Sequence, residues 1–312
     1  MQATRTQTAS TVNIGTYLRR KSVRAVIWGT IVSAILAIGA LLLLFPVAFM
    51  IVTAGKTSGN AFLLPIRWLP WIQFQPIWGK NLHDVVAFVH WWPVDGGLIL
   101  DPKNSIFNTL KVVANNAVAD VISASIVAYG FSRFRAPGKN FLFTLVLATL
   151  MIPYVSRLVP EYLGFAKLGL VDTLWPLVIP PWFGSAFNIF LLRQFFMSIP
   201  LEMDEAARID GAGPIRTYFS VLLPQIRPAL AVVAIGSFTF NWNDFLRPLI
   251  YLNSPEQRTA AIALSYFQAT YGGTPYNLLM MASLLMLIPV LVLFFIAQRY
   301  FIQGIVVSGV KG

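Results

Sequence analysis

Six predominantly apolar stretches, separated by polar or basic turns, follow one another along the chain. They are Ala25–Ala54, Ile106–Phe131, Phe141–Pro160, Thr173–Arg193, Val221–Tyr251 and Tyr276–Gln298. A helix needs about 20 apolar residues to cross the hydrocarbon core of a bilayer, and each stretch reaches or approaches that length. The pattern therefore predicts an all-α integral membrane protein with six transmembrane helices.

Polar and helix-breaking residues interrupt or border three of these stretches, the second, third and fifth. They are Asp120, Pro153, Pro224, Arg227 and Asp244. In lipid, such residues persist only where neighbouring protein or a water-filled path satisfies the backbone groups that they leave free. A bundle that lines a solute pathway would show this pattern.

The composition excludes a water-soluble globular domain. Hydrophobic residues make up 57% of the 312 residues and charged residues only 11%, with a mean hydropathy of +0.69. A soluble domain carries roughly 25% charged residues, which help to cover its surface. Membrane lipid must therefore contact much of this chain.

The basic residues indicate the orientation of the helices. The net charge is +11, and Lys and Arg lie at the ends of the apolar stretches, as topology rather than nucleic-acid binding requires. Basic residues concentrate on the cytoplasmic side, which places the segment 1–24 inside the cell. The run 25–54 is about twice the apolar core of a cleaved signal peptide, so it is expected to remain as the first helix. Six spans then place both termini in the cytoplasm.

The segment 55–105 is expected to form an external loop. It is rich in tryptophan and proline; the tryptophans are Trp68, Trp71, Trp78, Trp91 and Trp92. One interpretation is a docking platform for an external partner or a lid over the pathway. The other is an aromatic belt at the level of the lipid headgroups.

The sequence contains no set of residues typical of an active site. It has no cysteine, and its two histidines, His83 and His90, are too few for a histidine-rich metal site. It also has no Ser-His-Asp set and no Gly-rich phosphate-binding loop of the Walker type. We therefore predict no catalytic residue, no metal site and no cofactor bound by this chain.

A short helix with acidic residues at its start is predicted between the fourth and fifth spans, within about 200–213. Pro200 suits its first turn, and the acidic residues after it lie at the positive end of the helix dipole. Gly211 and Gly213 would end it. From the residues alone, this helix is either a cytoplasmic docking helix or an ordinary loop helix.

At these residues the chain resembles the inner-membrane permeases of binding-protein-dependent ABC importers. The signature of that family is Glu-Ala-Ala, three residues, Gly, nine residues and Ile-x-Leu-Pro. Here Glu205-Ala206-Ala207, Gly211 and Val221–Pro224 match it at every spacing, with Val in place of Ile. The stretch Phe240–Phe245 and the tail Gln298–Gly312 are similar to the maltose-importer subfamily, which transports carbohydrates.

The resemblance implies an organisation of the chain and a set of partners. It implies a five-helix permease core over 106–300, a cytoplasmic tail over 301–312, a second homologous permease, an external solute-binding protein and a dimer of ATPase subunits. ATP and Mg would be bound by the ATPase, and the complex would lie in a bacterial or archaeal cytoplasmic membrane. The residues implied to contact the ATPase are Glu205, Ala206, Ala207, Asp210, Gly211 and Pro224, with Gln303, Gly304, Gly309 and Lys311 in the tail.

Helix periodicity suggests residues for the solute pathway. Ser237, Asn241 and Asp244 recur on one face of the fifth helix, next to Phe245, and would contact solute hydroxyl groups or bond to other helices. Arg247 is expected beside Asp244. A second polar stripe follows the second helix, where hydrogen bonding between helices is the favoured interpretation. Its members are Asn116, Asp120 and Ser123.

Two alternative functions remain open at this level. One is an ABC permease for a polyol, an amino acid or a phosphate ester. The other is an ion-driven secondary transporter, which would need an ionisable relay in the membrane and would leave the Glu205 motif without a purpose.

Overall fold

The computed structural model of the protein describes residues 14–57, 59, 61, 74–88, 105–270 and 275–308, and every regular element in these ranges is a helix. By length and apolar composition, four of the helices in these described ranges can cross a membrane. The number rises to six if each of two sharply bent helix pairs counts as one span. The expected all-α membrane architecture is therefore confirmed.

The chain divides into two units, Met1–Val52 and Thr53–Gly312. The first consists of most of α1 (Ile14–Ala54). From residue 25 to residue 48 nearly all its side chains are exposed, as expected for a helix surrounded by lipid. The 30 residues Ala25–Ala54 span about 45 Å, enough to cross a bilayer with some tilt.

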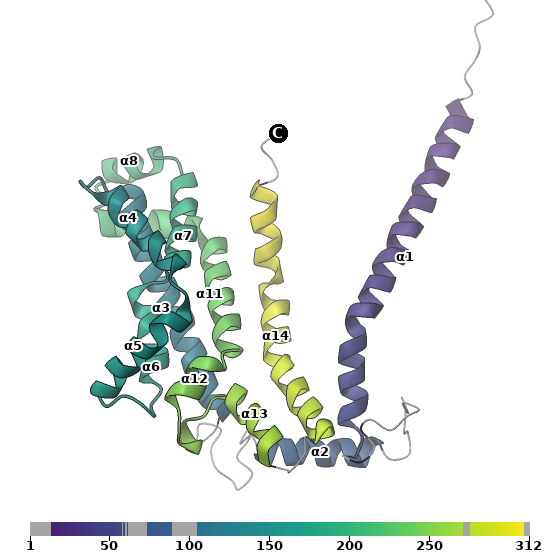
Figure 1. Cartoon of the computed structure of the whole chain (residues 1–312). Helices are drawn as coiled ribbons and strands as arrows, with labels where there is room; N and C mark the ends of the chain where they lie inside the picture. Colours follow the sequence, from purple (N-terminus) through teal and green to yellow (C-terminus); the bar gives the residue numbers. More distant parts are fainter. Residues whose placement is uncertain are drawn as a thin grey trace, which may run out of the picture. The chain divides into compact units, whose positions relative to one another are not determined.

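The second unit holds the other elements (Figure 1). The longer α-helices are α2 (Phe74–Phe88), α3 (Ser105–Arg133), α4 (Lys139–Ala148), α5 (Tyr154–Lys167), α7 (Ala186–Ser198), α8 (Glu202–Ile209), α11 (Arg227–Trp242), α13 (Ala260–Thr270) and α14 (Tyr276–Ser308). The short ones are α6 (Trp175–Val178), α9 (Pro214–Thr217), α10 (Leu223–Gln225) and α12 (Leu246–Tyr251), with 3₁₀ turns at Thr149–Met151, Pro180–Phe183 and Pro255–Gln257 and a π-helix at Tyr218–Leu222.

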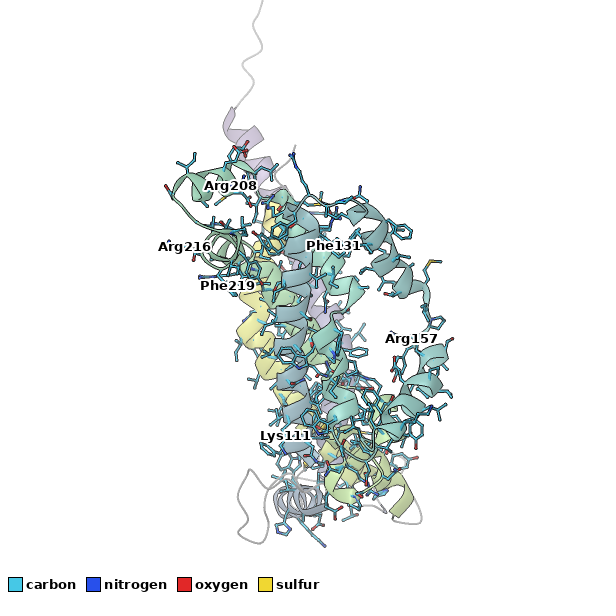
Figure 2. All side chains as sticks on the ribbon, turned by 90° about the vertical axis from the view of Figure 1, so that its left-hand side faces the viewer. Lys111, Phe131, Arg157, Arg208, Arg216 and Phe219 are labelled. Atoms are coloured by element: carbon cyan, nitrogen blue, oxygen red, sulfur yellow. The ribbon has the colours of Figure 1, made fainter. Side chains whose placement is uncertain are left out.

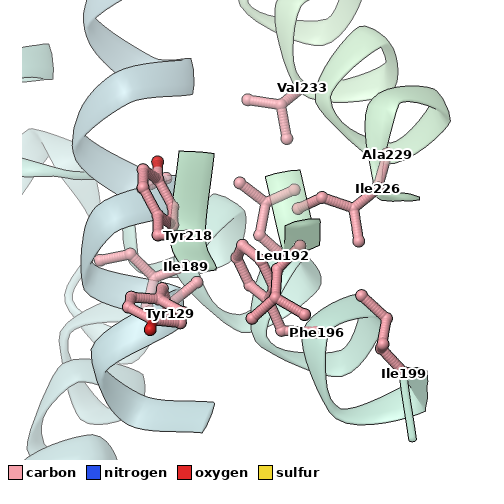
Figure 3. Close-up of a cluster of buried hydrophobic side chains, with 12 residues drawn as sticks. Tyr129, Ile189, Leu192, Phe196, Ile199, Tyr218, Ile226, Ala229 and Val233 are labelled. Carbon is pink, nitrogen blue, oxygen red and sulfur yellow. The ribbon is translucent and has the colours of Figure 1, made fainter. Parts of the chain in front are cut away.

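Helix α3 is the centre of this unit. It packs against α7 and α11 along its length and also contacts α6 and α13. The largest cluster of buried apolar side chains joins α3, α7 and α11 with the segment between α7 and α11 (Figure 3). Its largest fully buried members are Phe196, Leu192 and Leu222. Tyr129 of α3 lies against Phe196 and Tyr218 there, so that aromatic contacts reinforce the packing.

The side chains of α3 also satisfy backbone groups that irregular segments leave free. Asn115 and Asn116 donate to the carbonyl oxygens of Val178 and Leu177 at 2.9 and 3.1 Å, where α6 ends. Ser123 donates to the Pro181 carbonyl oxygen in the adjoining 3₁₀ turn. Such bonds are what allow broken helices to persist where water is scarce.

Two of the predicted spans bend sharply at a break, and a third, Thr173–Arg193, consists of α6, a 3₁₀ turn and most of α7. The stretch Phe141–Pro160 bends by 97° between Met151 and Tyr154, because Ile152 is held extended before Pro153. The stretch Val221–Tyr251 bends by 79° between α10 and α11, and α11 already ends at Trp242. The first break therefore lies at Pro153, and the second lies at the non-helical Ile226, between Pro224 and Pro228.

The expected external loop 55–105 contains a helix that the sequence analysis did not predict, α2. The amide of its Asn81 donates to the carbonyl oxygens of Ala54 and Lys56 at 2.7 and 2.9 Å, and α2 packs against α14. Trp78 packs beside the buried Val85 there. The other four tryptophans and His90 lie outside the described residues.

A carboxylate clasp joins the segment after α5 to the segment after α12. Asp172 has the left-handed φ of 63°, and its carboxylate accepts the backbone N–H groups of Asn253 and Ser254 at 2.8 Å and the Ser254 hydroxyl. The hydrogen bonds from Ser254, first of all that from its hydroxyl, hold the pKa of the Asp172 carboxyl below its ordinary value.

The clasp predicts a specific loss of stability in acid. Because the folded-state pKa of Asp172 is depressed, the carboxylate contributes fully to the free energy of unfolding above the unfolded-state pKa of about 3.9. This contribution disappears as the pH falls through the folded-state pKa. Asp172→Asn keeps a residue that tolerates a positive φ and removes this titration. Melting temperatures between about pH 6 and pH 3 should therefore fall more steeply for the wild-type protein than for Asp172→Asn. Parallel curves would contradict the assignment.

Candidate functional site

The predicted docking helix is α8, eight residues from Glu202 to Ile209. Glu202, Asp204 and Glu205 occupy its first turn, where negative charge is stabilised by the helix dipole. It lies at the end of the second unit opposite α12 and α13 (Figure 1).

Gly211 ends the helix in a Schellman motif. Its φ is +77°, and its N–H donates to the Arg208 carbonyl oxygen at 3.0 Å. The N–H of Ala212 donates to the Ala207 carbonyl oxygen at 2.8 Å. A side chain at this φ is strained. The sequence prediction that glycine stops the helix here is therefore confirmed in its physical detail.

One side of α8 is attached and the other is exposed. Ala207 is buried and Met203 packs against the apolar cluster of α3, α7 and α11. Glu205 and Ala206 are exposed, and Ile209 is 86% exposed. Beyond the helix Ile215 is 75% exposed, with Arg216 beside it, and Arg208 and Arg216 lie at this end of the unit in Figure 2. Exposed apolar side chains among charged ones form a surface suited to a protein partner.

The second half of the motif leads into an interruption between two helices, α10 and α11. After α9, residues Tyr218–Leu222 form a π-helix, a feature that often marks functional segments. Pro224 follows in α10, and the non-helical Ile226 separates α10 from α11. Asp210 is the C-cap residue of α8 and is exposed.

Three polar side chains of α3 contact the chain on both sides of α8, between Ile199 and Tyr218. The sequence analysis did not predict this group. Arg133 forms an ion pair with Asp204 of α8 at 3.3 Å and donates to the Ile199 carbonyl oxygen at 2.9 Å. The Tyr129 hydroxyl donates to the Pro214 carbonyl oxygen at 3.0 Å. Ser125 shares a hydrogen bond of 2.8 Å with the Tyr218 hydroxyl. The sequence shows the four-residue spacing of these side chains, but it does not show their hydrogen-bonding and ionic partners.

A pocket of about 510 Å³ lies between α3, α5, α7 and α11. Its charged lining residues are Asp120, Arg157 and Arg247; its neutral polar and aromatic ones include Ser185, Asn188, Ser237, Phe240 and Asn241. Asn188 and Ser237 lie next to the Asp120 carboxylate. Carboxylate, amide, hydroxyl and guanidinium groups beside an exposed aromatic ring can bind a hydroxyl-rich solute.

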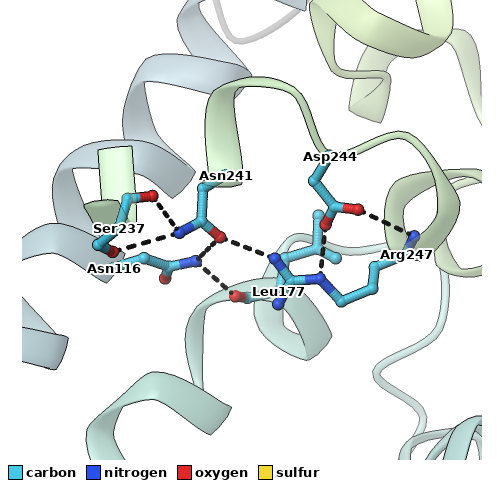
Figure 4. Close-up of polar contacts among 6 residues, drawn as sticks. All are labelled: Asn116, Leu177, Ser237, Asn241, Asp244 and Arg247. Atoms are coloured by element: carbon cyan, nitrogen blue, oxygen red, sulfur yellow. Dashed lines mark hydrogen bonds and ion pairs between the residues drawn. The ribbon is translucent and has the colours of Figure 1, made fainter. Parts of the chain in front are cut away.

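Asn241 is the hub of a buried polar network at the edge of this pocket (Figure 4). Its amide group donates to the Ser237 carbonyl oxygen at 2.7 Å, and its oxygen accepts hydrogen bonds from Asn116 at 2.7 Å and from Arg247 at 2.8 Å. Arg247 is also paired with Asp244 at 2.5 Å. Of the four residues expected in the solute pathway, Ser237 and Asn241 line the pocket, whereas Asp244 and Phe245 do not.

Asp244 departs from its expected position because α11 ends before it. Asn243 caps the helix, so Asp244 lies in the turn that leads to α12 rather than on the helix face of Ser237 and Asn241. The expected proximity of Arg247 is nevertheless observed. On α3, Asn116 and Ser123 bond to neighbouring segments as expected. The Asp120 carboxylate lies next to Ser237 of α11 and Asn188 of α7, as hydrogen bonding between helices requires, and it also lies on the wall of the pocket.

The residues implied for the tail are only partly described. Helix α14 continues to Ser308, so the backbone at Gln303 and Gly304 is helical. Gly309 and Lys311 lie outside the described residues. Within the described ranges, no three His, Asp or Glu side chains come together as a metal site would require.

Comparisons with known proteins agree with the motif. Residues 121–307 match the family described as "Binding-protein-dependent transport system inner membrane component". The sn-glycerol-3-phosphate transport system permease protein UgpE of Yersinia pestis is 33% identical over 279 residues, which cover 88% of this chain and 94% of that protein. The Brucella abortus (strain 2308) protein of the same name is 31% identical over 273 residues, covering 87% and 94%.

A solved structure supports the fold. A chain of a bacterial ABC transporter involved in the import of the acidic polysaccharide alginate superposes with a TM-score of 0.71. The match covers 88% of this chain and 96% of that chain at 22% identity.

The pocket geometry predicts different effects for two neighbouring substitutions. Asn241→Ala leaves Asn116 and Arg247 short of a partner, so it should lower stability by about 1–3 kcal/mol as well as transport. Asp120→Asn removes the charge but keeps the size of the side chain and one acceptor oxygen at the pocket wall, so it should change the KM or rate of uptake with little change in melting temperature. The measurement is solute uptake alongside thermal unfolding of the purified complex. Unchanged uptake by Asp120→Asn would remove that residue from the pathway.

Proposed function

The chain belongs to the family of binding-protein-dependent transport system inner membrane components, the permease subunits of ABC importers, and we propose that its solute is a sugar or a sugar-like molecule. The observation that carries the transport function is the Glu205–Pro224 motif, placed on an exposed helix that Gly211 ends at a positive φ. The solute class is supported by the polar pocket with the exposed Phe240.

We propose that α8 is the helix that docks into the ATPase. Glu205 and Ala206 face outward and would contact a groove on that subunit, while Ala207 holds the helix to its own core. Asp210, Gly211 and Pro224 would shape the turn and the bend that follow. ATP and Mg would be bound and used by the ATPase dimer, so that this chain contributes movement without chemistry.

The membrane arrangement follows from the same proposal. Each bent helix pair counts as one span, which gives six spans with both termini in the cytoplasm. Arg133 pairs with Asp204 of α8 and Arg216 lies in α9, which contacts α8, as the cytoplasmic side requires. A second permease would complete the pathway across a bacterial or archaeal cytoplasmic membrane, and an external binding protein would deliver the solute. The tail from Gln303 to Lys311 would approach the ATPase subunits.

A phosphate ester of a polyol is a second candidate solute. Arg157 is an exposed cation on the pocket wall, and the relatives from Yersinia pestis and Brucella abortus are named for sn-glycerol-3-phosphate. Uptake by the reconstituted complex of maltose, a plain polyol and sn-glycerol-3-phosphate would decide between the candidates. The sugar proposal fails if only the phosphate ester is transported.

The docking proposal predicts the effect of two substitutions in α8. Glu205→Lys reverses the exposed charge, and Gly211→Asp strains the cap at a cost of about 1–2 kcal/mol. Both should leave the protein in the membrane and reduce the ATPase that co-purifies with it. Glu256→Lys makes the same charge reversal at an exposed site far from α8 and serves as the control. If both α8 variants retain the ATPase and transport normally, α8 is not the docking helix.

A further inference from the structure

The three α3 residues that contact the chain around α8, from Ile199 to Tyr218 and here called the docking segment, form a single stripe. Ser125, Tyr129 and Arg133 are four residues apart and therefore lie on one face of the helix. Together they contact the chain before α8, α8 itself, the start of α9 and the π-helix. The stripe thus holds the docking segment on both sides of α8.

The covalent route from α8 to the pocket is much less rigid. It passes through the glycine turn at Gly211, the π-helix and the 79° break before α11. A movement of α8 can be absorbed at each of these points, because glycine turns and helix breaks are where backbone angles change most easily. Helix α3, in contrast, runs without interruption for 29 residues, about 43 Å.

The other end of α3 reaches the pocket. Asn116 lies 17 residues before Arg133, about 26 Å along the helix, and bonds to Asn241. Asp120 lines the pocket itself. One rigid helix therefore carries both the contacts to the docking segment and part of the pocket wall.

The ion pair between Arg133 and Asp204 is the strongest candidate for the key contact. The two side chains are only 6% and 15% exposed, so water screens them little. The guanidinium group donates at the same time to Ile199, just before α8, which the single ammonium group of a lysine does less well. Removing either charge leaves the other buried without its partner.

We propose that α3 transmits the displacement of α8 to the solute pocket, and that Arg133 and Asp204 are the positioning pair for this step. The proposal rests on the docking role of α8 proposed above, and it adds a route and two residues that the family motif does not contain. The pair contacts neither the solute nor nucleotide; it acts by keeping α8 and α3 in one rigid body.

The absence of cysteine from the sequence provides a direct test. Ser185→Cys places a single thiol of this chain on the pocket wall, and its labelling by a water-soluble maleimide is measured in the complete complex, without nucleotide and with ATP plus vanadate. We expect the labelling rate to change about tenfold between the two states, and this change to fall to about twofold or less with Arg133→Asp or Asp204→Arg. The double variant, which restores an opposite-charge pair, should recover most of the response.

Arg135→Asp is the matched control. It makes the same charge change two residues away at an exposed position and should respond like the parent. Tyr129→Phe removes only the hydroxyl that bonds to Pro214 and should give an intermediate response, which keeps the test informative if Arg133→Asp does not assemble. Melting temperature and bound ATPase are measured for every variant.

The outcomes separate this proposal from the docking role itself. If Arg133→Asp retains the ATPase but loses the labelling response, and the double variant regains it, the α3 route is supported. If Arg133→Asp responds like the parent, or the assembled double variant does not recover, the route is wrong even though α8 still docks. Loss of the docking role would instead appear as normal ATPase retention by Glu205→Lys and Gly211→Asp.

Discussion

The second unit depends on one constraint: backbone groups freed by broken helices need hydrogen-bond partners where water is scarce. Helix α3 supplies many of these partners. At one end Asn108 donates to the Glu256 and Arg258 carbonyl oxygens, and Thr109 accepts the Ala260 N–H. In the middle its asparagines and Ser123 serve the α6 segment, and at the other end Tyr129 and Arg133 serve the segment around α8. Without these donors the breaks would leave buried polar groups unpaired.

This arrangement explains why a polar helix can lie inside a membrane protein. The second apolar stretch remains one continuous helix although it carries several polar side chains, because these face α6, α7 and α11 rather than lipid. The lipid-facing requirement is met by α1 and by the outer sides of α4 and α14, which expose many large apolar side chains. Burial and polarity are therefore divided between helices according to their neighbours.

The same constraint relates the pocket to the docking segment. Breaks near α6, at the bend before α5 and between α10 and α11 create the irregular surfaces that a pocket and a movable contact require. Helix α3 bonds to the carbonyl groups of the α6 segment, packs along α7 and α11, and so links both regions. A permease whose pocket responds to a separate subunit bound at α8 needs such a link between the two sites.

The sequence by itself determined the class of the protein, because lipid imposes a length and polarity rule on each span and the Glu-Ala-Ala motif has a fixed spacing. It also located α8 and its glycine cap, since both depend on local interactions. The partners of Arg133, the angles of the bends at Ile152–Pro153 and Ile226, and the end of α11 before Asp244 were decided by the tertiary structure. These features depend on residues far away in the chain, such as the pairing of Asn116 with Asn241 across 125 positions. A periodic pattern shows that polar residues share a face, but only packing determines whether that face meets a solute, a carbonyl group or another helix.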